Sequence, residues 1–327
     1  MATNLSGDRI KPFRWTRLVC LGISIVLFVL VIQRVKWDSV KGGWASLEWQ
    51  WAVAALSLFG LSCSLAAFRW RMMLKLTEVP CSRSQALRGV LVGHFFNGIL
   101  LGPAGGDMAK SAVFSRWHGA PVSQLLAGSV MDRLAGGCGS LLFLIGAVGA
   151  AFATNNPLAK RDWDFDWAGP ELALGFVCVP VAGWFGYRFL VKQGSFLQRF
   201  LKNLLGAFQK IRAQPKTMAL GIGLAFLVQL FLHGVMILSL AAVSDAPIPW
   251  LQLLWVFPII SMLTSMPISI AGVGVREAGA MVLLGWYGVP AGEAVAASVL
   301  TLSANLFWAV VGACLLCAKE GVPFRRK

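Results

Sequence analysis

The sequence predicts an all-α, polytopic membrane protein, and three observations lead to this fold class. Of the 327 residues, 57% are hydrophobic and only 13% are charged, and the mean hydropathy is +0.71. Several apolar stretches approach the roughly 20 residues that a helix needs to cross a bilayer. The formal net charge of +15 is concentrated between those stretches. This distribution is typical of membrane topology and contact with anionic lipid, and it argues against nucleic acid as a partner.

Six apolar windows are expected to cross the membrane as full spans. They cover residues 18–32, 51–74, 122–153, 172–191, 218–243 and 295–317. Two further segments, 86–114 and 250–286, are apolar but are interrupted by Pro and Gly. Lipid cannot satisfy the backbone groups freed at such breaks, so they survive only inside protein or beside a wet cavity. Each broken segment is therefore expected to form either a re-entrant hairpin or a pair of spans.

The distribution of charge predicts how these segments are oriented. Lys and Arg cluster before residue 18, over 69–88, over 188–216 and after residue 318, which places these regions and both termini in the cytoplasm. The acidic segment 155–171 belongs on the other side. All regions fall on their expected sides only if each broken segment enters and leaves on the same face. Two oppositely directed hairpins then indicate an inverted-topology repeat, with halves at about 1–155 and 170–320 of one membrane domain, 1–327.

Two adjacent charges, Asp132 and Arg133, fall inside the third window. At 1.5 Å per helical residue they lie roughly 15 Å deep, where an unpaired charge costs several kcal/mol. Neighbouring residues point about 100° apart on a helix, so each needs a partner on another element. The candidates are Arg276 for Asp132, and Asp107 or Glu277 for Arg133. Two interpretations stay open, a structural ion-pair network that locks the halves together and a substrate-binding role.

The first break contains Gly105, Gly106 and Asp107 just before a predicted helix. The opening amides of a helix are free and carry a positive partial charge, so such an end accepts anions, phosphate especially. Asp107 is equally able to cap those amides as an ordinary N-cap. His94 and Asn97 precede the break with a spacing of three residues and are expected to share a polar face.

The second break contains Gly272 and Gly274, followed by Arg276 and Glu277 in the first turn of a helix. Glu277 suits the helix dipole there and Arg276 does not, which suggests that Arg276 serves a partner. That partner is either Asp132 or an anionic headgroup, because the planar fork of Arg fits phosphate. Ser261 is one of several hydroxyls near this break that are expected to satisfy backbone groups or line a pathway.

Patterns for enzymes and cofactors are missing from the sequence. The seven Cys mostly fall in apolar segments, and the pair Cys314 and Cys317 has no second pair to complete a metal site. No phosphate-binding loop or dinucleotide fingerprint occurs. We therefore expect no cofactor, no metal and no enzymatic activity.

Four motifs together resemble the flippase-like transmembrane family named after the membrane region of lysylphosphatidylglycerol synthases. The motifs are Phe68-Arg69-Trp70-Arg71, the run from Phe96-Asn97 to Gly105-Gly106-Asp107, Ser129 to Leu134 with Asp132-Arg133, and Pro267-Ile268-Ser269 with Gly272 to Glu277. Lys110 stands where the family commonly has a basic residue. The resemblance implies a helical membrane domain that moves lipids or lipid-linked precursors between leaflets. The chain ends at Lys327 without the aminoacyl-transferase domain of the synthases, so aminoacyl-lipid synthesis is not expected.

These observations predict a bacterial inner-membrane protein that translocates an anionic or phosphate-bearing lipid. Arg133 and Arg276 would contact the headgroup, and Asp107, Asp132 and Glu277 would pair with them when the site is empty. A membrane-embedded transferase, with Asp107 or Asp132 as base, is one alternative. Another is a scaffold for a lipid-biosynthetic enzyme. The expected partners are a phospholipid or lipid-linked substrate and either a second copy of the chain or such an enzyme.

Overall fold

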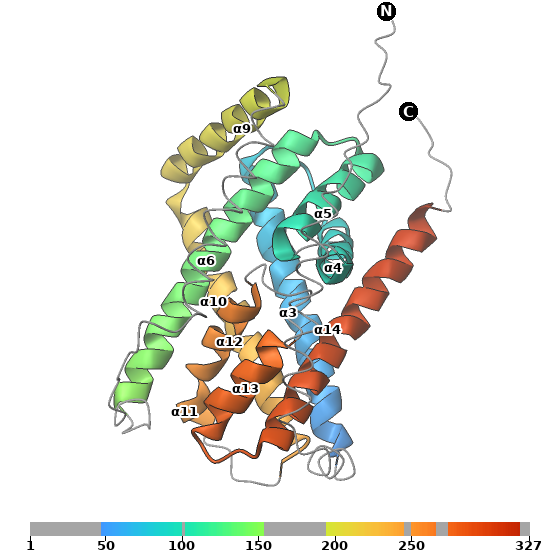
Figure 1. Cartoon of the computed structure of the whole chain (residues 1–327). Helices are drawn as coiled ribbons and strands as arrows, with labels where there is room; N and C mark the ends of the chain where they lie inside the picture. The colour runs from blue at the N-terminus through green and yellow to red at the C-terminus, as the bar shows by residue number, and fades with distance from the viewer. Residues whose placement is uncertain (1–46, 100–101, 154–193, 245–249, 266–273, 321–327) are drawn as a thin grey trace, which may run out of the picture.

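The structure is a computed structural model that describes residues 47–99, 102–153, 194–244, 250–265 and 274–320. Within these residues the regular elements are all α-helical, as the sequence predicts (Figure 1). The helices are α3 (Trp49–Leu76), α4 (Arg83–Ile99), α5 (Gly102–His118), α6 (Val122–Ala153), α9 (Gly194–Ala213), α10 (Pro215–Ala241), α11 (Trp250–Leu253), α12 (Val256–Ser265), α13 (Val275–Gly285) and α14 (Ala291–Glu320).

Four of these helices, α3, α6, α10 and α14, are long and apolar enough to cross a membrane. They confirm the windows at 51–74, 122–153, 218–243 and 295–317, and with them the polytopic membrane fold. The windows at 18–32 and 172–191, and the boundary between the two halves, lie outside the described residues. An internal repeat therefore stays a prediction.

Small residues allow neighbouring helices to approach closely. Gly139 of α6 lies against α10, where an added Cβ would be 2.5 Å from Ala225 Cβ. Gly312 of α14 lies directly against the Leu91 carbonyl of α4. Inside lipid, such contacts supply the van der Waals packing that holds helices together.

The first broken segment forms an antiparallel hairpin of α4 and α5. Gln85 and His118, at the outer ends of the two helices, are 3.2 Å apart (Nε2 to Nδ1). Farther in, Gly93 packs on the Lys110 side chain and Gly106 on Asn97. Figure 1 shows both helices in the upper half of the molecule, while α3 and α6 continue far below them. The segment is therefore re-entrant, and the alternative of two full spans is wrong.

The second broken segment forms a similar hairpin of α12 and α13, directed the opposite way. Trp255 Nε1 donates to the Tyr287 hydroxyl at 2.6 Å, which joins the outer ends of the two helices. Those ends lie at the lower end of the molecule, where α10 finishes and α3 begins (Figure 1). There the Glu48 amide donates to the Ala242 carbonyl at 3.0 Å. The prediction of two oppositely directed hairpins is confirmed, although residues 100–101 and 266–273 of the breaks lie outside the described parts.

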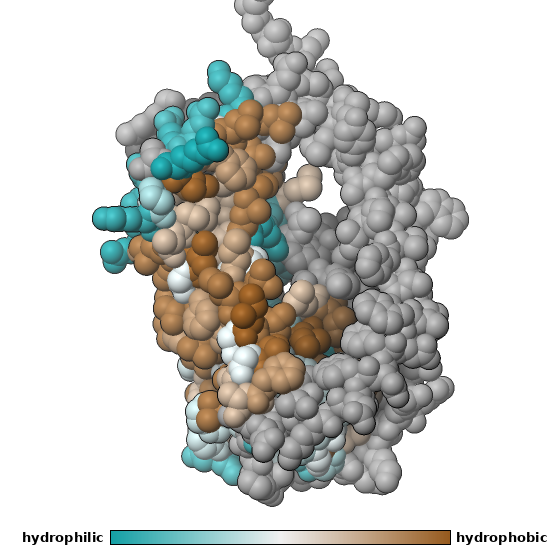
Figure 2. Space-filling view, turned by 90° about the vertical axis from the view of Figure 1, so that its left-hand side faces the viewer, coloured by the Kyte–Doolittle hydropathy of each residue, from teal (hydrophilic) through white to brown (hydrophobic). Residues whose placement is uncertain are grey.

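The amphipathic helix α9 covers the upper end of α3 and α6. Lys210 Nζ lies 2.6 Å from Glu78 Oε1, and Asn203 Nδ2 donates to Ser123 Oγ at 3.1 Å. The Lys210 ammonium lowers the pKa of the Glu78 carboxyl. Figure 2 shows hydrophilic patches at the upper and lower ends of this face and a broad hydrophobic band between them. Such a band is what a lipid-facing surface requires.

Candidate functional site

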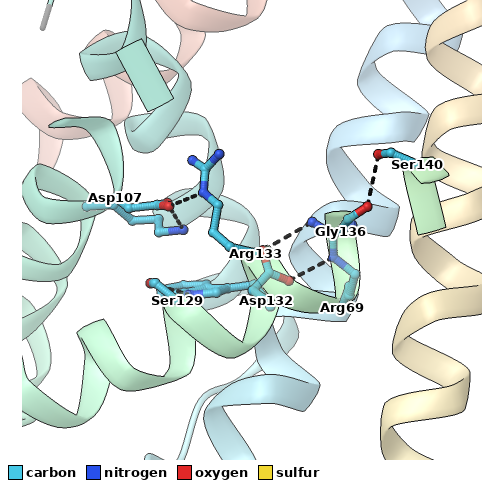
Figure 3. Close-up of polar contacts among 9 residues, drawn as sticks. Arg69, Asp107, Ser129, Asp132, Arg133, Gly136 and Ser140 are labelled. Carbon is cyan, nitrogen blue, oxygen red and sulfur yellow. Dashed lines mark hydrogen bonds and ion pairs between the residues drawn. The ribbon is translucent and has the colours of Figure 1, made fainter. Parts of the chain in front are cut away.

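Asp132 of α6 is held by Arg69 of α3 through two hydrogen bonds. Arg69 Nε donates to Oδ1 at 2.7 Å and Nη2 donates to Oδ2 at 3.1 Å (Figure 3). Only 13% and 14% of the two side chains are exposed. The guanidinium lies beside Gly136, one turn farther along α6, where a Cβ would be in ordinary contact with Arg69 Nη1 at 3.4 Å. The prediction that Asp132 pairs with Arg276 is therefore wrong.

Arg133 of α6 is paired with Asp107 of α5, one of the two predicted partners. Its Nε donates to Asp107 Oδ2 at 2.6 Å, and Lys110 Nζ lies 2.8 Å from Oδ1 of the same carboxylate. Lys110 is buried, with its ammonium 4.4 Å above the centre of the Trp70 ring. Arg133 remains 49% exposed, and Figure 3 shows its terminal nitrogens directed away from Asp107. One carboxylate thus holds two cations.

The glycines of the first break lie inside α5, because this helix already begins at Gly102. Asp107 is therefore not the N-cap that the sequence allowed; its two oxygens bind Lys110 and Arg133 instead. Gly106 is buried against the side chain of Asn97, and Gly105 is half-buried. Here the glycines allow α4 and α5 to touch.

Arg276 and Glu277 belong to a separate network in the second hairpin. Arg276 Nε donates to Glu277 Oε1 at 3.3 Å, and the Gly274 amide donates to Glu277 Oε2 at 2.6 Å. Gly274 has φ +86°, a conformation that suits glycine. Ser298 of α14 donates to Glu277 Oε1 at 3.1 Å. Glu277 is therefore not the partner of Arg133, and Gly272 lies outside the described residues.

A cavity of about 610 Å³ joins the two hairpins, a volume within the usual range of ligand sites. Its wall comes from α3, α4, α5, α6, α10 and α12. Among the described residues of the wall, the charged ones are Arg69, Asp107, Lys110, Asp132 and Arg133, so three cations face two carboxylates. The cavity reaches Leu141 and Met262, which are 56% and 50% exposed on the apolar outside. The cavity wall thus combines charged side chains with exposed apolar ones.

The sequence predicted part of this wall. Asn97, Asp107, Lys110, Asp132, Arg133 and Ser261 line the cavity, while Gly105, Gly106, Gly274, Arg276 and Glu277 do not. Arg69, Ser140, Gln229 and His233 were missed. Their polarity inside apolar helices is the signal that could have found them. No group of three or more His, Cys, Asp or Glu suited to a metal occurs in the described parts of the chain.

The sequence of this chain matches that of a known family of membrane domains. The sequence profile of the lysylphosphatidylglycerol synthase TM region matches residues 17–313. The chain belongs to this family. No curated protein matches it. The part that matches the lysylphosphatidylglycerol synthase TM region contains both hairpins and the complete cavity wall. Membership connects the chain with the handling of lipids in a membrane.

Proposed function

We propose that this protein moves a lipid with an anionic, phosphate-bearing headgroup between the two leaflets of a membrane. The observation that carries the proposal is the cavity at the first hairpin, in which three cations face only two carboxylates. One negative charge therefore neutralises the cavity. Charged groups inside membrane-spanning segments are costly in contact with lipid and are typical of substrate pathways.

The geometry supports a headgroup inside the cavity and acyl chains outside it. Arg133 is the most exposed member of the cluster, and its planar guanidinium suits two oxygens of a phosphate. The exposed side chains of Leu141 and Met262 border the same cavity and offer an apolar surface to the acyl chains. Movement of this kind breaks no covalent bond, so the proposed activity is transport and not catalysis.

The second hairpin does not bind the headgroup in this proposal. Arg276 and Glu277 are buried in contact with each other and do not line the cavity. We therefore assign them to the attachment of α13 to α14, through Ser298, and keep Arg133, Lys110 and Arg69 for the headgroup. Lys75 near the end of α3, Arg83 at the start of α4 and Lys210 of α9 make the upper end of the molecule basic. We propose that this end faces the cytoplasm of a bacterial inner membrane.

Transport in reconstituted vesicles tests the proposal. The purified protein is placed in liposomes with phosphatidylglycerol that carries a fluorescent acyl chain, and dithionite reports how fast the label changes leaflets. Arg133→Ala should slow this exchange about tenfold or more, because it removes charge-assisted hydrogen bonds to phosphate.

Arg88→Ala is the matched control, because Arg88 is exposed on α4 and does not line the cavity. It should exchange lipid at the wild-type rate. Equal rates for wild-type and Arg133→Ala protein, both shown to be folded and inserted, would refute the proposed site. Exchange no faster than in protein-free liposomes would refute transport itself.

A further inference from the structure

The cavity has a second polar region, formed by Ser140, Gln229 and His233. It adjoins the charged cluster, because Ser140 Oγ donates to the Gly136 carbonyl at 2.9 Å, beside Arg69 (Figure 3). Ser140 follows Asp132 by two turns of α6, roughly 12 Å along the helix axis. Gln229 and His233 come from α10, one turn apart. No charged side chain belongs to this region, and we refer to these three residues as the neutral region.

The neutral region offers hydrogen-bond acceptors that lack donors. Gln229 Nε2 donates to Ser140 Oγ, and Gln229 Oε1 is buried without a partner among the described residues. His233 Nδ1 lies 2.8 Å from the Gln229 carbonyl oxygen, which only accepts, so the neutral ring carries its proton on Nδ1. His233 Nε2 is then an acceptor, and it is also buried without a partner.

The described residues around these atoms do not supply the missing donors. The His233 ring packs against the rings of Phe143, at 4.5 Å between centroids, and Phe257, at 6.0 Å. Unsatisfied buried acceptors are unfavourable and rare, and they are commonly explained by a ligand or a function. The terminal torsion of Gln is broad, so a rotation can present Oε1 to the cavity.

We propose that the neutral region is a second binding region for the headgroup, reached after the charged cluster, and that it accepts hydrogen bonds from hydroxyl or ammonium groups. This inference rests on the proposed function and narrows the substrate class. The favoured lipid carries a phosphate for the arginines and, in addition, hydrogen-bond donors. A lipid with the same charge and no donor should be moved poorly.

A comparison of two lipids of equal charge distinguishes the proposed neutral region from a purely electrostatic site. Phosphatidylglycerol has two hydroxyls on its headgroup, and phosphatidylmethanol has none. The rates at which the two labelled lipids change leaflets are measured in the same vesicle preparation. Wild-type protein should move phosphatidylglycerol about tenfold faster, as expected for hydrogen bonds that buried acceptors make with one lipid only.

Gln229→Met and His233→Phe remove the two acceptors with little change in volume. In each variant the ratio of the two rates should fall to about threefold, because one acceptor remains, and in the double variant it should fall to about one. A loss of folded protein lowers both rates and leaves the ratio unchanged, so the ratio reports the neutral region alone. Gln214→Met, at an exposed position between α9 and α10, is the matched control and should keep the wild-type ratio.

A wild-type ratio near one, or an unchanged ratio in both variants, would overturn the inference. A failure of the proposed function has another outcome, in which neither lipid moves faster than in protein-free vesicles. In that case competition between the two lipids for the protein in detergent, measured by native mass spectrometry, decides. Preferential binding of phosphatidylglycerol that the double variant abolishes would support the neutral region, and equal binding would reject it.

Discussion

Two neighbouring side chains on α6 form ion pairs with two different helices. Asp132 binds Arg69 of α3, and Arg133 binds Asp107 of α5. This division follows from the helix itself, because successive residues point about 100° apart and cannot share one partner. The charge pair that looks self-neutralising in the sequence therefore connects a long span to a re-entrant hairpin.

The Arg69–Asp132 pair should be strongly coupled. Asp132→Leu leaves Arg69 buried without its carboxylate and should lower the free energy of unfolding by about 3 kcal/mol. The double variant Arg69→Met/Asp132→Leu should recover much of this loss, since no unpaired charge remains. Chemical unfolding in detergent micelles, followed by tryptophan fluorescence, measures both changes.

Lys210→Met is the control for that measurement. It breaks the Glu78–Lys210 pair, whose side chains are 74% and 38% exposed, and should change stability little. If the double variant is no more stable than Asp132→Leu alone, the two side chains are not coupled as the structure indicates.

At the scale of elements, the first hairpin depends on a glycine, which lets α4 and α5 touch because it has no side chain. Gly106 of α5 touches Asn97 of α4, and a Cβ at Gly106 would lie 2.8 Å from the Gly93 carbonyl oxygen. Backbone cannot move aside as a flexible side chain does. The positions of Asp107 and Lys110, on the same face of the cavity wall, therefore depend on this contact.

Gly106→Ala should force α4 and α5 apart. We expect a loss of about 1–3 kcal/mol in the free energy of unfolding, typical of an overpacked contact. Lipid exchange should slow as well, because Asp107 and Lys110 move with α5. Gly223→Ala, on α10 with nothing within 4 Å of the added Cβ, should be neutral or stabilise by up to about 1 kcal/mol. Thermal unfolding that ranks the two variants the other way would contradict the close contact.

At the scale of the whole molecule, two hairpins enter from opposite ends and share one cavity. The wall includes α4 and α5 from one hairpin and α12 from the other. Each hairpin also packs on α14, α4 through Gly312 and α13 through the Glu277–Ser298 hydrogen bond. One span thus connects both re-entrant elements.

Labelling from the two sides of the membrane tests this arrangement. In a variant without native cysteines, Ser82→Cys lies at the outer end of the first hairpin and Ala291→Cys follows the second, both at exposed positions. A membrane-impermeant maleimide applied from one side should label only one of them, and from the other side only the other. Labelling of both from the same side would show that the hairpins do not enter from opposite faces.

The sequence was sufficient to predict the described spans and hairpins, but it did not predict the partner of Asp132. The length of the apolar windows, their breaks and the charge distribution predicted the four described spans and both hairpins, because hydropathy and backbone satisfaction are local constraints. The partner of Asp132 depended on how deep each hairpin reaches, which contacts such as Gly312 against Leu91 determine. Arg69 was grouped with the basic residues that mark topology, although it lies inside an apolar window. Only the packing of α3 on α6 shows that it is paired.

The excess of one cation in the cavity has an electrical consequence. In the proposed transport, a headgroup with one negative charge would balance the described charges of the wall when bound, and the charge itself would travel across the membrane's electric field. Each 100 mV then changes the free energy of transfer by about 2.3 kcal/mol. A potential that is negative on the side of the basic end would drive an anionic lipid toward the opposite leaflet. A potassium diffusion potential across vesicles tests this expectation: reversing its sign should reverse the direction in which labelled phosphatidylglycerol accumulates.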